Sequence, residues 1–161
     1  MRIPLSVLAL STLLLPIGAL AAKPASSEAI TAAISQQLNR YEQALNSADV
    51  ERVMALYADD AVFMPQHSQP AVGREAVRTA YRRVFDTIKP DIRFQIDEIR
   101  PLSRDWAFAR TRSSGTVKLL SSGQQASPEA NQEIFLLHRE TDGQWRFARY
   151  IFSTTNPPKQ P

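Results

Sequence analysis

The sequence predicts an α+β fold, in which three helices from the first half of the chain pack on a curved antiparallel sheet from the second half. Before Pro90, most apolar residues recur every three or four positions, which is typical of amphipathic helices. After Pro90 they alternate with polar residues, which is typical of strands with one buried face. Because the helices precede most of the strands, the α+β class is favoured over a parallel α/β fold.

Three helical segments are expected before Pro90. The first has Ser27 as its N-cap, and its apolar stripe, with spacings of 4, 4, 3 and 4, consists of Ile30, Ile34, Leu38, Tyr41 and Leu45. The second follows Asp49 as its N-cap and ends at residues 58–60. The third follows Gly73 and is closed by Pro90, which cannot continue the helical hydrogen-bond ladder.

The expected strands cover residues 61–64, 92–99, 106–120, 131–140 and 144–154. Ile99 lies one place out of phase with the apolar residues before it, which predicts a bulge. Gly115 is expected to interrupt its strand, and Asp142-Gly143 predicts a hairpin turn. Such a sheet must curl around the helices to bury both apolar sets, which leaves a cavity between its concave face and the first helix.

The start of the chain predicts export. Arg2, an apolar run over residues 5–15 and Ala19-Leu20-Ala21 are typical of a secretory signal peptide with cleavage near Ala21. A buried N-terminal helix is the alternative, and its prolines disfavour it. We expect a periplasmic or secreted protein with no membrane association after cleavage. The expected divisions are a signal peptide over 1–21, a leader over 22–27, a domain over 28–155 and a Pro-rich tail over 156–161.

Composition limits the functions to consider. The 161 residues include no cysteine, so neither disulfides nor a thiol nucleophile are expected. The net charge of +3, which falls to +2 when Arg2 is removed, is spread along the chain and predicts no nucleic-acid partner. No phosphate-binding or dinucleotide-binding glycine motif and no metal-ligand spacing of the two histidines is present, so we expect no cofactor and no metal.

Four features in this order resemble one family. They are Tyr41, the run from Asp49 that ends in YADDAVF, Gly73-Arg74-Glu75 and Gly143-Gln144-Trp145. Over residues 30–152 the chain resembles the NTF2-like superfamily, in the SnoaL-like and DUF4440 branch that includes ketosteroid isomerase. The resemblance implies a cone-shaped barrel and a homodimer formed through the outer face of the sheet.

Steroid isomerases of that superfamily use a tyrosine and a neutral acid as oxyanion donors and another carboxylate as base. The resemblance places Tyr41 at the tyrosine position. It places Met64 at the base and Phe135 at the second acid, and neither can transfer a proton. A standard ketosteroid isomerase is therefore not expected.

The predicted ligand site combines aromatic and polar residues on the faces assigned to the cavity. Its members are Tyr41, Tyr57, Met64, Tyr81, Phe85, Phe108, Arg110, Arg112, Asn131, Glu133, Phe135, Tyr150 and Phe152. Alternation places the two arginines on one face with Trp106 and Phe108. The resemblance implies that this face and the face of Glu133 line the cavity, where one arginine would pair with Glu133. Such a pair would either position a polar ligand or only satisfy the interior of the sheet.

Tyr41, Asp60 and His67 are the candidates for proton transfer. Asp60 could act with Asp59, although acceptance of backbone hydrogen bonds at a helix–strand corner is the favoured interpretation. His67 lies in a polar loop, where a surface position is favoured over a general base, and His138 is expected to point outward.

Three functions are consistent with these features. The first is an exported, homodimeric protein that binds a small organic molecule in an apolar cone. The second is a cofactor-independent isomerase, dehydratase or cyclase, so the sequence leaves open whether the protein is an enzyme. The third is a protein-interaction module with a vestigial pocket, which would use the outward-facing residues Ile134, Leu136 and Ile151.

Overall fold

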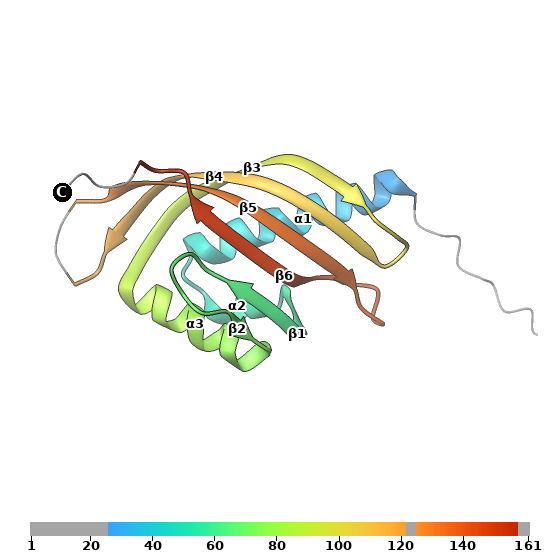
Figure 1. Ribbon diagram of the computed structural model, residues 1–161, viewed down its shortest axis with the longest axis horizontal. Helices are drawn as coiled ribbons and strands as arrows, with labels where there is room; N and C mark the ends of the chain where they lie inside the picture. Colours follow the sequence, from blue (N-terminus) through green and yellow to red (C-terminus); the bar gives the residue numbers. More distant parts are fainter. Residues whose placement is uncertain (1–25, 122–124, 158–161) are drawn as a thin grey trace, which may run out of the picture.

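The computed structural model describes residues 26–121 and 125–157, which form three helices and one six-stranded sheet (Figure 1). The helices are α1 (Ser27–Asn46), α2 (Val50–Met54) and α3 (Arg74–Thr87). The strands are β1 (Tyr57–Met64), β2 (Ala71–Val72), β3 (Ile88–Pro101), β4 (Trp106–Leu119), β5 (Ser127–Arg139) and β6 (Trp145–Thr154). The predicted signal peptide, most of the leader and the end of the tail lie outside the described residues. Among the described helices, none has the length and apolar character needed to cross a membrane.

The sheet confirms the predicted α+β class. Its order is β2-β1-β6-β5-β4-β3, and Figure 1 shows the long strands bending around the side on which α1 and α3 lie. The sheet is curved and open rather than closed into a barrel. The four strands predicted after the third helix are antiparallel, as expected, and the short strand β1 joins the sheet parallel to β6.

Helix α1 packs against the concave face along its whole apolar stripe. All five residues predicted for that stripe are buried, and Ile34 and Leu38 are fully inaccessible. The N-cap is Ser26, one residue earlier than predicted, and its Oγ accepts a hydrogen bond from the Ala29 amide at 3.2 Å. The amphipathic period therefore located the helix and its buried face correctly.

Two polar side chains of α1 attach the helix to edge strand β3. The Phe94 amide donates to Glu42 Oε2 at 2.7 Å. Asn46 Oδ1 accepts from the Ile92 amide at 2.9 Å, while its Nδ2 donates to the Ile92 carbonyl at 2.8 Å. These bonds occupy backbone groups at a sheet edge, so they hold β3 beside α1. The distance between the helix and the sheet is thereby fixed.

The second and third helices are shorter than predicted. Helix α2 ends at Met54, and β1 begins at Tyr57 because the chain there already pairs with β6. Helix α3 ends at Thr87, and Pro90 lies within β3 instead of closing the helix. Proline is tolerated there because β3 is an edge strand and can leave an N–H position unpaired.

Two irregularities shape the β3–β4 pair. The predicted bulge is confirmed, since the register moves from Ile96 opposite Thr111 to Glu98 opposite Arg110 and leaves Asp97 unpaired. The predicted interruption at Gly115 is wrong, because β4 continues through it. Gly115 has φ of 154°, and a Cβ there would lie 2.1 Å from the Asp91 carbonyl oxygen. The absent side chain permits this close approach of the two strands.

Replacing Gly115 by alanine should destabilise the domain by about 3 kcal/mol or more, because the backbone of β3 must move away. Urea unfolding measures the change. Ser114→Ala on the exposed neighbour is the matched control and should stay within about 0.5 kcal/mol of the wild type. A Gly115→Ala protein as stable as this control would contradict the close approach.

Candidate functional site

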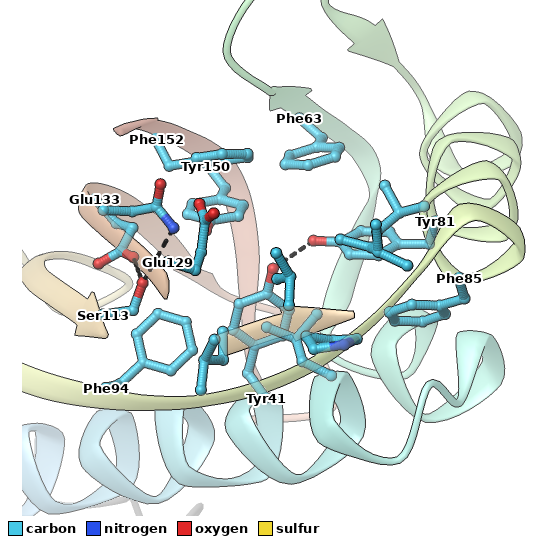
Figure 2. Close-up of a pocket in the computed structure, with 17 residues that line it drawn as sticks. Tyr41, Phe63, Tyr81, Phe85, Phe94, Ser113, Glu129, Glu133, Tyr150 and Phe152 are labelled. Atoms are coloured by element: carbon cyan, nitrogen blue, oxygen red, sulfur yellow. Dashed lines mark hydrogen bonds between the residues drawn. The ribbon is translucent and has the colours of Figure 1, made fainter. Parts of the chain in front are cut away.

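A mostly apolar cavity of about 160 Å³ lies between α1, α3 and the concave face of the sheet. Figure 2 shows Glu133 and Ser113 on one side of it and Tyr81 and Phe85 on the other. The predicted site residues Tyr41, Tyr81, Phe85, Asn131, Glu133, Tyr150 and Phe152 all line this cavity. The structure therefore brings together about half of the predicted ligand site.

Stacked aromatic rings form one wall of the cavity. Phe63 stacks against Tyr81 with ring centroids 5.0 Å apart and against Tyr150 at 5.4 Å. Tyr150 in turn stacks on Phe135 at 4.2 Å. These rings pack on one another and give the cavity an apolar wall.

A cluster of tyrosine hydroxyls lies at the α1–α3 side of the cavity. Tyr81 Oη lies 2.5 Å from Tyr41 Oη and 2.7 Å from Tyr57 Oη. Burial is the main cause that raises the pKa of each of these three phenols well above 10.0. The three hydroxyls therefore stay protonated at neutral pH and act as hydrogen-bond donors, not as phenolates.

The tyrosine cluster has one proton more than its internal hydrogen bonds require. Three O–H groups share the two contacts made by Tyr81. The Tyr150 hydroxyl beside Tyr41 adds a fourth O–H group and a third contact, so one hydroxyl proton is left for another acceptor. Tyr41 and Tyr81 both line the cavity, whereas Tyr57 is fully buried behind them. This side of the cavity can therefore donate a hydrogen bond to a bound group.

Glu133 is a carboxylate buried at the opposite side of the cavity, with 2% of its surface exposed. Thr111 Oγ1 donates to its Oε2 at 2.5 Å, and the Ser113 hydroxyl donates to its Oε1. Loss of hydration raises the pKa of Glu133 above the ordinary 4.5, and these two hydrogen bonds only partly oppose that shift. A carboxyl with such a pKa can exchange a proton closer to neutral pH.

The predicted pair of Arg110 or Arg112 with Glu133 is wrong. Both arginines point to the outer face, where Arg110 Nη1 and Arg112 Nη2 each lie 2.9 Å from a carboxylate oxygen of Asp97. The Arg112 guanidinium is the first cause that lowers the pKa of Asp97. The bulge at Asp97 thus supplies the partner that the arginines need outside the cavity.

The error came from the alternation along β4. Alternation puts Trp106 and Phe108 on the face that the resemblance assigns to the cavity, yet Trp106 is 36% exposed and its ring centroid lies 4.5 Å from that of His138. The inner face instead carries the small residues Ala107, Ala109, Thr111 and Ser113, all of which are buried. Arg110 and Arg112 indicate the outward face of β4 more reliably, because arginine is rarely buried without a charged partner.

The remaining predicted residues lie away from the cavity surface. Tyr57 and Phe135 are buried behind it, while Met64 and Phe108 are half-buried elsewhere. The Asp60 side chain is 79% exposed and lies 3.7 Å from Arg149, so the predicted capping role at a helix–strand corner is wrong. His67 is exposed in its loop. Sequence reasoning missed Ser113, Phe94 and Glu129, which line the cavity.

No cluster of three or more potential metal ligands occurs within residues 26–121 and 125–157. The polar groups around the cavity are hydroxyls, one amide and two carboxylates. Their chemistry suits hydrogen bonding to an organic molecule and movement of a proton.

Comparison with known proteins identifies the family. Residues 38–153 match the SnoaL-like domain. The chain belongs to the SnoaL-like family. This SnoaL-like domain is 37% identical to a ketosteroid isomerase-like protein from Erwinia carotovora atroseptica, with a TM-score of 0.75, over 78% of this chain and 96% of that one.

Two further solved structures share the fold at lower identity. A proposed scytalone dehydratase from Novosphingobium aromaticivorans is 20% identical, with a TM-score of 0.71, over 79% of this chain and 85% of that one. A hexachlorocyclohexane dehydrochlorinase, LinA type 2, is 17% identical, with a TM-score of 0.68, over 80% and 87% of the two chains. These likenesses show the fold alone.

Replacing Tyr81 by phenylalanine should destabilise the SnoaL-like domain more than replacing Tyr57. Tyr81→Phe leaves two buried hydroxyls without their shared partner and should cost about 2–4 kcal/mol. Tyr57→Phe keeps the contact between Tyr41 and Tyr81 and should cost about 1 kcal/mol. Urea unfolding of both variants checks the order, and equal losses would show that Tyr81 is not the centre of the cluster.

Proposed function

We propose that this SnoaL-like protein binds a small, mostly apolar organic molecule of about one ring in the cavity beside α1. The observation that carries the proposal is the unfilled, aromatic-walled volume of about 160 Å³. A dry apolar cavity of about 150 Å³ is known to accept benzene. A four-ring steroid is much larger than this space and would extend beyond it.

The aromatic walls and the two polar sides supply what a ligand pocket needs. The rings of Phe63 and Tyr150 line the cavity and offer apolar surface to a ligand. Hydroxyls at one side and a carboxylate at the other fix the orientation of a bound molecule. A cavity left open in this way favours ligand binding over a protein-interaction module with a vestigial pocket.

Export and homodimer formation are part of the proposal. The signal-like start of the chain supports a periplasmic or secreted location. On the outer face of the sheet, Ile134 and Ile151 are directly paired and each is 44% exposed. Adjacent exposed isoleucines on a sheet face favour contact with a second copy, as the family resemblance implies.

Thermal unfolding with a set of single-ring aromatic and alicyclic compounds tests the binding. A compound at 100 times its Kd should stabilise the native state by about 2.7 kcal/mol and raise Tm by roughly 5–10 °C. Val84→Phe should abolish the shift, because Val84 lines the cavity and the added ring would occupy it.

Arg82→Ala on the exposed side of the same helix is the matched control and should keep the full shift. The Tm of each ligand-free variant shows that it folds. Shifts of equal size in Val84→Phe and the wild type would place binding outside the cavity and overturn the proposal.

A cofactor-independent enzyme is the second candidate, and the burial of Glu133 beside the cavity favours it. A carboxylate with a raised pKa can take a proton from carbon next to a carbonyl group. A tyrosine hydroxyl could then stabilise the enolate oxygen. Glu133, and not Met64 or Phe135, would be the base in such a reaction.

Deuterium exchange into cyclohexanone and related single-ring ketones in D₂O tests this second function. The protein should accelerate exchange next to the carbonyl, and Glu133→Gln should lower that rate by about 100-fold or more. Because only the ionised carboxylate is a base, the rate should rise with pH at values above 4.5. Glu75→Gln on the surface of α3 is the matched control. Exchange that is absent, or equal in Glu133→Gln, argues for a binding protein.

A further inference from the structure

Three acceptor side chains follow one another on the inner face of β5. Glu129, Asn131 and Glu133 occupy alternate positions of the strand, and all three line the cavity. Asn131 is 8% exposed, and its Oδ1 is buried without a hydrogen-bond partner among the described residues. A buried carbonyl oxygen left in this state is unfavourable and calls for a donor.

The hydrogen bonds around Asn131 determine which amide atom is left over. The Ser113 hydroxyl donates its only proton to the Glu133 carboxylate, so Ser113 Oγ can only accept from Asn131. Asn131 Nδ2 therefore faces Ser113, at 3.4 Å, and Oδ1 cannot use this neighbour. The unpaired oxygen is thus a consequence of the ionised carboxylate next to it.

The carboxylate of Glu133 also keeps acceptor capacity. Thr111 and Ser113 occupy two of its four acceptor positions. Of the described residues that line the cavity, none is lysine, arginine or histidine. An anionic ligand group would therefore lie beside two carboxylates with no cation to offset the repulsion.

We infer that the cavity selects a single-ring molecule whose polar end donates hydrogen bonds, as an amine or alcohol does, and that Asn131 Oδ1 and Glu133 accept them. A carboxylate-bearing ring is rejected. This inference rests on the proposed binding function and names the class of ligand for that same cavity. Asn131 is its specificity-determining residue.

The preference for a hydrogen-bond donor over a methyl group follows from the acceptor atoms of Asn131 and Glu133. A donor group on the ligand satisfies Asn131 Oδ1, whereas a methyl group at the same place leaves it unpaired. A protonated amine adds attraction to the carboxylates and to the faces of the surrounding aromatic rings. The expected preference for a donor over a methyl group is about tenfold or more.

Four matched probes test the inference by isothermal titration: benzylamine, benzyl alcohol, toluene and benzoate. Benzylamine and benzyl alcohol should bind about tenfold or more tightly than toluene, and benzoate should bind most weakly. Asn131→Leu, which keeps the size but removes the acceptor, should reduce the preference for benzyl alcohol over toluene to about twofold or less. Gln132→Leu on the exposed face of the same strand is the matched control and should retain the preference.

The outcomes separate this inference from the proposed function. Toluene binding as tightly as benzyl alcohol, or benzoate binding most tightly, overturns the inference and leaves the binding function standing. Binding of none of the four overturns both. If Asn131→Leu does not fold, the order of the four probes on the wild-type protein decides.

Discussion

The small side chains on the inner face of β4 are the feature on which the site depends. Ala107, Ala109, Thr111 and Ser113 take little space on the concave side of the sheet. The rings of Phe135 on β5 and Tyr150 on β6 stack on each other at 4.2 Å, and α1 packs nearby without filling the whole interior. The same alternation places Arg110 and Arg112 outside, where the bulged Asp97 binds both. Thr111 and Ser113 then supply the hydroxyls without which the buried Glu133 carboxylate would have no partner.

The cavity consequently has opposite hydrogen-bonding character at its two sides. Tyr41 and Tyr81 remain protonated because burial raises their pKa, and their cluster has a proton to donate. Glu133 and Asn131 hold acceptor atoms that their neighbours do not saturate. Aromatic rings lie between the two sides and make most of the surface there apolar. This arrangement can orient a small ring, and it also resembles what proton transfer next to a carbonyl requires.

Strand β5 differs from the steroid isomerase pattern in the position of its carboxylate. Phe135, at the position that the resemblance gives to a second acid, stacks on Tyr150 and belongs to the apolar wall. Glu133 lies two residues earlier on the same face of the strand, so a carboxylate is still presented to the cavity. The ligand of one ring that we propose matches the volume of about 160 Å³. The chain thus keeps the family's fold and presents a carboxylate from Glu133 and not from position 135.

The sequence by itself determined the class of fold, the buried stripe of α1, the bulge near Ile99 and the turn at Asp142-Gly143. Each of these follows from local periodicity or turn chemistry, which neighbouring residues in the chain express directly. It also identified Tyr41, Asn131, Glu133 and Tyr150 as cavity residues. Only the tertiary structure decided which face of β4 turns inward. One face carries both Trp106 and Phe108, which favour burial, and Arg110 and Arg112, which favour exposure. The partners of Glu133 and the unpaired oxygen of Asn131 were likewise set by contacts between strands, since residues far apart in the chain become neighbours only when the sheet curls around α1.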